Sequence, residues 1–336
     1  MRPQFYPHHC ERVELQQTMM SWVLLAGEFV YKIKKPVRFP FLDAATAAKR
    51  YRLCADEVAL NRRLAPDVYL GIKGIAEDHG VYCLVDDVDC KQSGVREFAV
   101  VMRRLPSERI LNRMIADNAV SASDMREIAK KLVSFHANAS IAKASIWGSA
   151  RAISRFVVCN VAHAHQIAAD SVTRELLATV AAYVRRYVVA RRQSLDNRAR
   201  DGHVREGHGD LRSKSVYFGP DDILILDCAE YSERMRYGDT ASELASLAVD
   251  LELAERPELA DALLEDYAAQ THDSEFLALL RFYKCHRAVL RGKLETLASL
   301  QLDLPAEQRV AARSNARRLF ALAHSYVSES AAPDAV

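Results

Sequence analysis

Apolar and polar residues alternate along much of residues 11–102, which is the period of half-buried β-strands. Between residues 44 and 64 the composition becomes helical instead, with Tyr51, Val58 and Leu64 among charged residues. This part of the chain therefore predicts a small lobe of strands with one helix. The predicted strands cover residues 12–15, 22–25, 29–33, 68–75, 81–85 and 97–102.

Helical spacing of apolar residues replaces this alternation beyond residue 107. Residues 125–135 place apolar side chains on one helical face, and Asp124 with Glu127 is the expected capping box of that helix. Another helix is expected to begin near Pro257, because proline suits the first helical turn. The second part of the chain is therefore predicted to be mainly helical.

One short hairpin interrupts the helical part. Residues 215–226 are typical of two strands joined by a Gly-Pro-Asp-Asp turn; Asp210 precedes this hairpin, and Asp227 follows it, seventeen positions after Asp210. In kinases an aspartate on a short loop accepts the proton of the substrate hydroxyl, and a second aspartate after the next hairpin binds Mg²⁺. The spacing indicates phosphoryl transfer, unless Asp210 is an ordinary turn residue and Asp227 an ordinary strand-end cap.

A kinase also needs a strand lysine that reaches the nucleotide phosphates and a helix glutamate that pairs with it. Lys32 ends the strand sequence Phe29-Val-Tyr-Lys32, and Glu57 lies in the helix that follows. Lys34 projects from the same strand face as Lys32, because strand side chains alternate with period two. We favour Lys32 as the phosphate lysine, with Lys34 as its competitor. The plainer interpretation is that Lys32, Lys34 and Lys35 form a solvated strand edge.

Composition narrows the class of protein. The chain has 336 residues, of which 50% are hydrophobic and 27% charged, enough for a large core in two lobes. Its net charge of +2 gives no basic field, so neither nucleic acid nor a membrane surface is an expected partner. The apolar stretches are too short to cross a bilayer and the seven cysteines form no C-x-x-C pair, so a cytoplasmic location is expected.

Several blocks of the sequence together resemble one known family, the bacterial aminoglycoside-phosphotransferase-like proteins, which have the protein-kinase-like fold and include uncharacterised members. The resemblance covers nearly the whole chain and is most specific at the lysine block and the His-Gly-Asp block. The blocks are Val30-Tyr-Lys-Ile-Lys-Lys-Pro-Val37, Leu60-Asn-Arg-Arg-Leu-Ala-Pro66 with Tyr69-Leu-Gly71, Met102-Arg-Arg-Leu105, Phe135-His136, His208-Gly-Asp-Leu-Arg212 and Asp227-Cys228 with Glu230-Tyr231. The stretches 237–244 and 283–293 extend the match.

This resemblance implies an α+β bilobal fold. Residues 1–104 would form a mostly antiparallel β lobe with one helix, and residues 105–330 a mainly helical lobe that carries the short catalytic hairpin. A nucleotide, ATP or GTP, is expected between the lobes together with Mg²⁺. The implied activity is transfer of the γ-phosphoryl group to a hydroxyl of a small metabolite. The sequence predicts no oligomeric state.

The resemblance also assigns roles at matching positions. It implies Asp210 as base, Asp227 as magnesium ligand and Lys32 with Glu57 at the nucleotide phosphates. Arg212 would lie near the transferring phosphoryl group, where a fixed positive charge stabilises the equatorial oxygens. The backbone at Met102, Arg103 and Leu105, where the chain crosses between lobes, would contact the nucleotide base.

Two departures from the family pattern leave an alternative open. Ser215 stands five residues after Asp210, where kinases place an asparagine for the second Mg²⁺, and a hydroxyl is a poorer metal ligand than an amide carbonyl. Residues 16–22 contain no glycine to cover the phosphates. The alternative is therefore a catalytically weak or inactive nucleotide-binding regulatory protein of the same fold. Protein kinase activity is less favoured, because Asp-Phe-Gly and Ala-Pro-Glu motifs are missing.

The acceptor is the least determined part of this interpretation. Glu230 and Glu233 follow Asp227 closely and could face a cationic acceptor such as an amino sugar. Pairing with Arg234 and Arg236 at the surface is the favoured explanation of these two glutamates.

Overall fold

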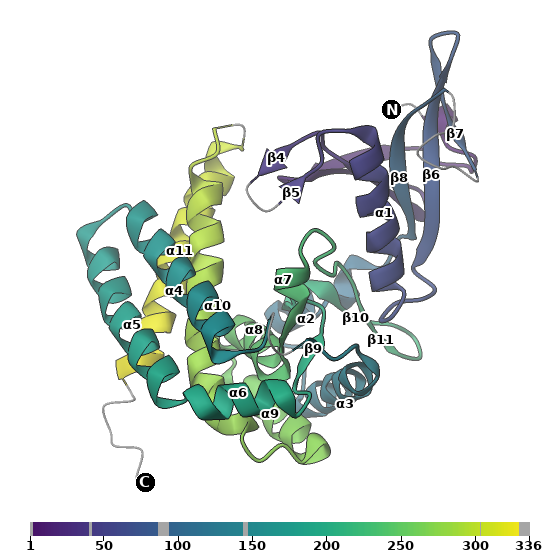
Figure 1. Ribbon diagram of the computed structural model, residues 1–336. Helices are drawn as coiled ribbons and strands as arrows, with labels where there is room; N and C mark the ends of the chain where they lie inside the picture. Colours follow the sequence, from purple (N-terminus) through teal and green to yellow (C-terminus); the bar gives the residue numbers. More distant parts are fainter. Residues whose placement is uncertain (1–2, 40–41, 87–93, 144–146, 303, 329–336) are drawn as a thin grey trace. The chain divides into compact units, whose positions relative to one another are not determined.

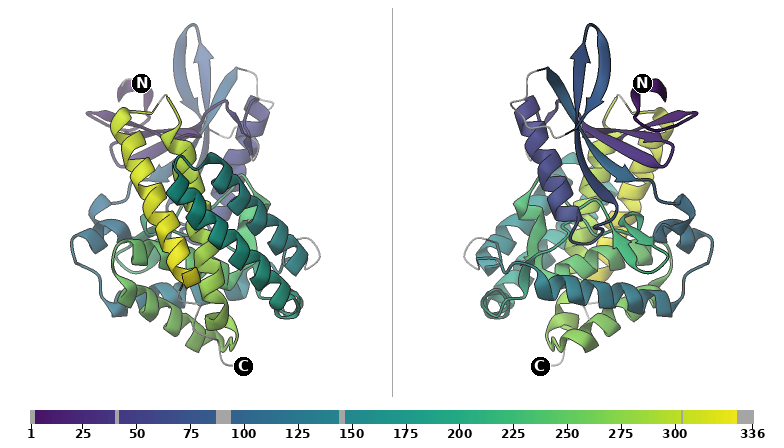
Figure 2. Two further views of the ribbon diagram at one scale, coloured as in Figure 1. Left: turned by 90° about the vertical axis from the view of Figure 1, so that its left-hand side faces the viewer. Right: turned by 90° about the vertical axis from the view of Figure 1, so that its right-hand side faces the viewer.

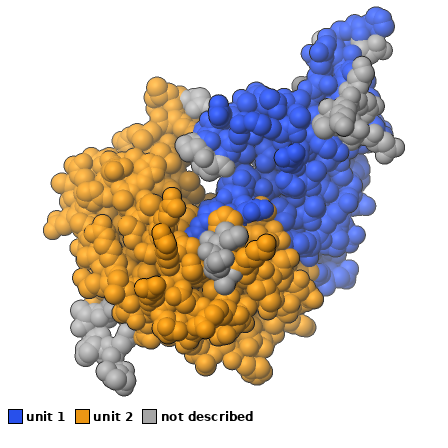
Figure 3. All heavy atoms as spheres, viewed as in Figure 1, with its two compact units in different colours: residues 1–114, 214–235 blue, residues 115–213, 236–336 orange. Residues whose placement is uncertain are grey.

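The computed structural model describes residues 3–39, 42–86, 94–143, 147–302 and 304–328 (Figures 1 and 2). The chain forms two compact units (Figure 3): unit 1 contains residues 1–114 and 214–235, and unit 2 contains residues 115–213 and 236–336. Unit 1 is built on an antiparallel sheet and unit 2 on helices, which confirms the predicted α+β class. The hairpin that sequence analysis assigned to the second lobe groups with unit 1, and the lobe boundary at residue 104 stays a prediction.

The sheet of unit 1 is six-stranded and antiparallel throughout (Figure 1). Its strands, in their order across the sheet, are β1 (Val13–Gln17), β2 (Ser21–Ala26), β3 (Phe29–Lys34), β8 (Val95–Arg103), β6 (Tyr69–Asp78) and β7 (Val81–Val85). Two further pairs belong to this unit: β4 (Arg38–Phe39) with β5 (Leu42–Asp43), and β10 (Val216–Phe218) with β11 (Ile223–Ile225).

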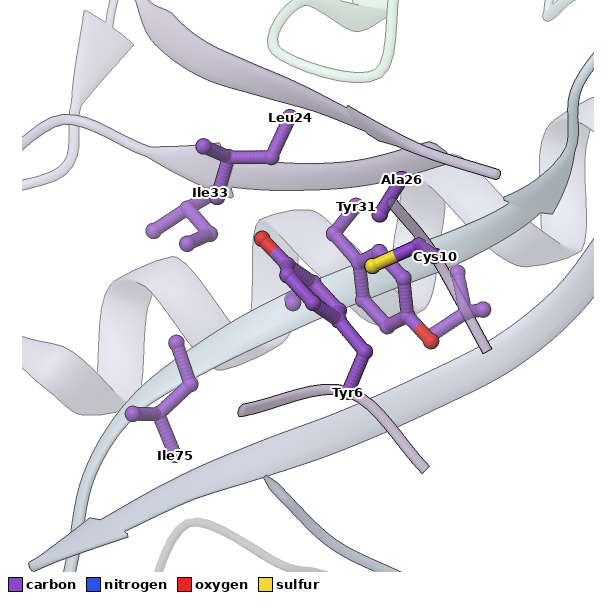
Figure 4. Packing of buried hydrophobic residues seen from close by; sticks show 9 residues of the cluster. Tyr6, Cys10, Leu24, Ala26, Tyr31, Ile33 and Ile75 are labelled. Atoms are coloured by element: carbon purple, nitrogen blue, oxygen red, sulfur yellow. The ribbon is translucent and has the colours of Figure 1, made fainter. Parts of the chain in front are cut away.

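Alternation along β3 sends its side chains to two different layers. Tyr31 and Ile33 enter an apolar cluster on one face, where Figure 4 shows the ring of Tyr6 against that of Tyr31 with Cys10 beside them. Val30 packs into the cluster of the opposite face, which also contains residues of α1 (Ala47–Asn61). Because β-strand side chains have a period of two, Lys32 and Lys34 project from the same face as Val30.

Helix α1 lies on that second face because its own apolar positions are spaced for it. Cys54 and Val58, four residues apart, pack with Val30 and other sheet residues. Glu57 and Asn61 lie on the same buried side of the helix. The helix begins at the N-cap Thr46, whose side chain accepts a hydrogen bond from the Lys49 N–H at 3.3 Å.

The hairpin β10–β11 joins unit 1 for the same apolar reason. Leu224 and Leu226 pack against the cluster around Tyr69 and Met102. As Leu226 is the residue before Asp227, this packing carries Asp227 toward the sheet face from which Lys32 projects.

Unit 2 is mainly helical, and its two longest helices, α10 and α11, run side by side (Figures 1 and 2). A short antiparallel pair, β9 (Val204–Glu206) with β12 (Tyr237–Asp239), flanks the segment that contains Asp210. The helices are α3 (Ala122–Asn138), α4 (Ala150–Ile167), α5 (Ser171–Ala190), α6 (Arg192–Arg200), α8 (Thr240–Leu253), α9 (Pro257–Thr271), α10 (Phe276–Ser299) and α11 (Ala306–Ser328), with α2 (Leu111–Ala116) and α7 (Glu233–Arg236) at the unit boundaries.

One prediction about the start of a helix is wrong, and another is confirmed. Helix α3 begins earlier than expected, at the N-cap Ser121, and the side chain of Asp124 accepts the Ser121 N–H at 2.8 Å. The capping box therefore joins Ser121 to Asp124, and Glu127 takes no part in it, because the box requires a hydroxyl at the N-cap. Pro257 is at the start of α9, as predicted.

Two further observations concern cysteines and helix hydropathy. The described cysteines Cys10, Cys54, Cys83, Cys159, Cys228 and Cys285 are free thiols, whereas Cys90 lies outside the described residues. Among the helices of the described ranges, none combines the length and the apolar composition needed to span a bilayer.

Candidate active site

Two carboxylates from distant parts of the chain contact Lys32 in unit 1. The Lys32 Nζ lies 2.8 Å from Glu57 Oε1 on α1 and 2.7 Å from Asp227 Oδ1 after β11. Lys32 is 14% exposed and Asp227 is 52% exposed, so this end of the group faces solvent. Burial lowers the pKa of Lys32, but Asp227 and Glu57 outweigh it and raise that pKa well above its ordinary value. The two carboxylates therefore favour the charged ammonium form of Lys32.

Lys34 forms a second and deeper set of ion pairs. Its Nζ lies 2.5 Å from Glu57 Oε2 and also pairs with Glu230, a residue of the segment after Asp227. Lys34 is 4% exposed and Glu230 is 7% exposed. The interpretation of Lys32 and Lys34 as a solvated edge is therefore wrong, because the strand face from which both project is covered by α1 and by the segment after β11. We call the five residues Lys32, Lys34, Glu57, Asp227 and Glu230 the lysine cluster.

Glu57 is the centre of the lysine cluster, with one ammonium group on each carboxylate oxygen. Its side chain is 0% exposed, and such burial raises the pKa of a carboxyl group. Lys32 and Lys34 reverse this effect, so the pKa of Glu57 is lowered overall. A fully buried carboxylate is tolerated only with such pairing, because an isolated buried charge is very costly.

Glu230 corrects the expectation for the acidic residues after Asp227. It was predicted to pair with Arg234 or Arg236 at the surface, yet its side chain is buried against Lys34. Arg236 is itself buried and pairs with Glu206 at 3.1 Å. Glu233 alone of the two glutamates is exposed. Glu230 is therefore unavailable to a cationic acceptor.

Asp227 has a backbone conformation that is uncommon for a residue with a side chain. Its φ is 69°, in the left-handed region. Two side chains bind the backbone there: the Asp227 N–H donates to the Tyr69 hydroxyl at 3.2 Å, and the Cys228 N–H donates to Asn61 Oδ1 at 2.9 Å. Lys32 lowers the pKa of Asp227 strongly, more than burial raises it, so this carboxylate is ionised. Sequence reasoning gave no role to Tyr69 or Asn61 and placed Glu230 at the surface, although all three lie in blocks that carry the family resemblance.

The remaining predicted residues of unit 1 lie on its strands and turns. Ser215 is buried directly before β10, and its carbonyl accepts the Leu226 N–H at 2.9 Å, one residue before Asp227. Met102 is buried in β8 opposite Val30, and Leu105 packs at the edge of the same cluster. The Arg103 N–H already donates to the Val68 carbonyl at 2.9 Å, so that N–H is not free to bind a nucleotide base.

Asp210 and Arg212 belong to unit 2, on a loop that follows β9. Glu243 of α8 accepts the His208 N–H with both carboxylate oxygens, at 2.9 and 2.8 Å. Gly207 must be glycine, because a Cβ there would lie 1.8 Å from Glu243 Oε2. Gly209 has a φ of 90°, which favours glycine. The loop therefore depends on two glycines and one buried carboxylate.

Side chains from two other helices contact this loop or its partner Glu243. Arg287 of α10 donates from Nη1 to the Gly209 carbonyl at 3.1 Å. His136 of α3 lies 3.3 Å from Glu243 Oε1 and 2.8 Å from the Tyr267 hydroxyl. Burial raises the pKa of Glu243, but His136 and His208 lower it to about 2. The Asp210 N–H donates to His208 Nδ1 at 3.3 Å, so the His208 side chain binds the backbone of this loop.

Asp250 binds the end of the loop and is paired with Arg291. The Asp250 carboxylate accepts the Ser213 N–H at 2.7 Å and the Ser213 hydroxyl at 2.8 Å, and it pairs with Arg291. Burial raises the pKa of Asp250, whereas Arg291 and Arg212 together lower it below its ordinary value. Asp210 itself is half-buried on this loop.

Comparison with known proteins identifies the class. The phosphotransferase enzyme family matches residues 27–280, and the chain belongs to that family. Uncharacterised proteins of Mycobacterium tuberculosis and Mycobacterium bovis are 31% identical over 284 residues, which is 84% of this chain and 54% of theirs. The chain thus spans about half the length of these relatives.

Solved structures of the same fold are small-molecule kinases. A choline kinase from Cryptosporidium parvum superposes with a TM-score of 0.55 and 12% identity, covering 96% of this chain and 91% of that one. A thermostable mutant of an aminoglycoside phosphotransferase gives 0.53 and 12% identity, with 97% of each chain covered. An amicoumacin kinase, solved with AMP-PNP and Ca²⁺, gives 0.50 and 12% identity, covering 94% of this chain and 89% of that one. At this identity the similarity establishes the fold.

Proposed function

We propose that this protein is a small-molecule kinase that transfers the γ-phosphoryl group of ATP or GTP to a hydroxyl group of a metabolite. The observation that carries the proposal is the contact of Lys32 with both Glu57 and Asp227, at 2.8 and 2.7 Å. A kinase requires these three residue types together, because the lysine binds the nucleotide phosphates, the glutamate orients the lysine and the aspartate binds the metal.

The residues of unit 1 fit a nucleotide with a divalent cation. Asp227 offers an ionised and half-exposed carboxylate, and Mg²⁺ prefers oxygen ligands of this kind. Bound there, Mg²⁺ would neutralise negative charge on the phosphates. The amicoumacin kinase of the same fold, solved with AMP-PNP and Ca²⁺, supports this use of a nucleotide and a metal. Ser215 is the proposed second ligand. Its carbonyl accepts the N–H of Leu226, the residue directly before Asp227.

The residues of unit 2 carry the remaining proposed roles. Asp210 acts as the base that accepts the proton of the acceptor hydroxyl, and Arg212 stabilises negative charge on the transferring phosphoryl group.

The backbone of the Met102–Leu105 segment in unit 1 contacts the nucleotide base. The Arg103 N–H is excluded from this role, because it donates to the Val68 carbonyl.

The test separates an enzyme from a nucleotide-binding regulator. Mg²⁺ with ATP or GTP should raise the melting temperature, because a ligand that binds only the folded state stabilises it. A panel of hydroxylated metabolites, amino alcohols and amino sugars included, should contain an acceptor that becomes phosphorylated. With that acceptor Asp210→Asn should lower kcat by at least about 10²-fold while nucleotide binding is retained.

The control is Asp221→Asn in the exposed turn of the hairpin, which should leave both readouts unchanged. Nucleotide binding without turnover across the panel would favour the regulator. Full turnover in Asp210→Asn would remove the proposed base.

A further inference from the structure

Glu57 has two lysine partners, although a kinase needs only one on this glutamate. The Lys32 Nζ lies 2.8 Å from Glu57 Oε1, and the Lys34 Nζ lies 2.5 Å from Glu57 Oε2. The two lysines differ in what they can reach: Lys32 also contacts the half-exposed Asp227, whereas the other partner of Lys34 is the buried Glu230. Only Lys32 is therefore able to bind a nucleotide, and the pair formed by Lys34 and Glu230 has no access to one.

The same pair fixes the chain that follows Asp227. Glu230 lies three residues after Asp227, so the ion pair with Lys34 joins this segment to β3. The Cys228 N–H is bound by Asn61, one helical turn after Glu57 on α1. The segment from Asp227 to Glu230 is therefore attached to the strand that carries Lys32 and to the helix that carries Glu57. The contacts with this strand and this helix are Lys32 to Asp227, Asn61 to Cys228 and Lys34 to Glu230, in addition to the bond from the Asp227 N–H to the Tyr69 hydroxyl.

Charge balance explains why a second lysine is useful. When Lys32 moves from Asp227 to a phosphate group, it can also loosen its contact with Glu57. Without another cation, Glu57 would then be a buried and unpaired carboxylate, which is strongly unfavourable. Lys34 keeps Oε2 paired throughout, and Glu230 in turn compensates the charge of Lys34.

We propose that Lys34 and Glu230 are positioning residues that keep Glu57 oriented toward Lys32 and fix the Asp227–Glu230 segment for metal and nucleotide binding. In protein kinases the segment after the metal-binding aspartate moves and is ordered by phosphorylation. Here a buried ion pair replaces that switch, so the binding geometry is formed before the nucleotide arrives. The inference rests on the proposed function, because it assigns Lys32 and Asp227 to the nucleotide and metal.

The experiment measures Mg-ATP affinity by calorimetric titration and thermal stability without ligand, for wild type and three variants. Glu230→Gln keeps the shape of the side chain and removes its charge, and it should weaken Mg-ATP binding by about tenfold, as loss of a supporting partner commonly does. Lys34→Met should weaken binding further, because it leaves both Glu57 Oε2 and Glu230 without their cation.

The double variant Lys34→Met with Glu230→Gln distinguishes positioning from simple stabilisation. It removes the buried charge that Lys34→Met leaves at Glu230, so the melting temperature should recover relative to Lys34→Met. Affinity for Mg-ATP should stay at least about tenfold below wild type, because Glu57 still lacks its second partner. The matched control is Lys73→Met, which removes an ion pair with Asp86 from β6 of the same unit and should leave Mg-ATP affinity unchanged.

The outcomes separate two failures. Folded variants that bind Mg-ATP as tightly as wild type would show that the pair only stabilises unit 1, and the positioning role would be rejected. A folded wild-type protein that binds neither Mg-ATP nor Mg-GTP would instead contradict the proposed function, and the positioning role would fall with it.

Discussion

Units 1 and 2 hold their candidate catalytic residues in place by different kinds of contact. In unit 1, the lysine cluster consists of charged side chains that contact one another. In unit 2, side chains bind the backbone of the loop around Asp210, with Glu243 on the His208 N–H and Arg287 on the Gly209 carbonyl. Neither of these contacts involves the side chain of Asp210.

The difference matches what each group has to do in the proposed reaction. A lysine bound by ion pairs can exchange a carboxylate for a phosphate while its backbone stays in place. A base must remain at one position and keep its carboxylate available, so it is best placed by fixing the backbone on either side of it. Mutations should therefore affect folding most in unit 2, where backbone contacts are buried, and ligand binding most in unit 1.

The largest effect is expected from Gly207→Ala. The added Cβ would lie 1.8 Å from Glu243 Oε2, and Glu243 cannot move aside without leaving the His208 N–H and its own charge buried and unpaired. We expect the free energy of unfolding to fall by about 4 kcal/mol, measured by urea unfolding. Gly238→Ala is the matched control in the same unit, because its Cβ would meet nothing within 4 Å. Equal stability of the two variants would show that Glu243 moves freely and that the loop is not fixed as described.

The next effect is the acid dependence of stability that Glu243 produces. Its pKa is about 2 in the folded protein against an ordinary 4.5, so its contribution is complete above about pH 4.5 and is lost as the pH falls toward 2. This contribution is at most about 3 kcal/mol. The unfolding free energies of wild type and Glu243→Gln should therefore differ most near neutral pH and converge on acidification.

Urea unfolding between pH 7 and pH 3 measures this convergence. Glu258→Gln is the control, because its carboxylate is exposed and should give no comparable pH-dependent difference. A Glu243→Gln difference that does not change with pH would mean that hydrogen bonding, and not charge, accounts for the role of Glu243.

The parts of the fold that local pattern determines were predictable from the sequence. Strand alternation indicated β3, and the turn Gly219-Pro220 indicated the hairpin, because each depends on neighbouring residues. The start of α3 was missed because Asp124 looks like an N-cap when Ser121 is not considered. Packing of the hairpin into unit 1 depends on Leu224 and Leu226 meeting a distant cluster, and local pattern carries no such information.

The candidate site, like the fold, has parts that the sequence predicted and parts that it did not. Lys32, Glu57 and Asp227 were recognisable from spacing and motif, and they lie together. The sequence could not decide how Lys34 is used, since alternation gives it the same face as Lys32. Its actual partner Glu230 is 196 residues away along the chain, beside arginines that suggested a surface pair. Burial of a charged residue by a distant partner is a tertiary property, and it was the part that sequence reasoning assigned wrongly.

The smallest effect concerns a contact of unit 1 in which a side chain binds the backbone, as side chains do around Asp210 in unit 2. Asn61 accepts the Cys228 N–H at 2.9 Å and donates to the Glu57 carbonyl at 2.8 Å. Asn61→Ala should lower the free energy of unfolding by about 2 kcal/mol, because it leaves a buried N–H without its acceptor. Asn138→Ala is the matched control: Asn138 makes the same type of bond to the Ser134 carbonyl at 2.8 Å, but it is exposed.

Measuring the Mg-ATP affinity of Asn61→Ala and Asn138→Ala tests the comparison between the units further. If charged side chains alone define the site in unit 1, Asn61→Ala should lower stability and leave affinity within about twofold of wild type, since the ion pairs of Lys32 and Lys34 remain. A loss of affinity as large as that expected for Glu230→Gln would mean that the backbone at Cys228 must also be fixed. Unit 1 would then place Asp227 as unit 2 places Asp210, by binding the chain beside the carboxylate, and the two units would differ only in the charge of the residues that do so.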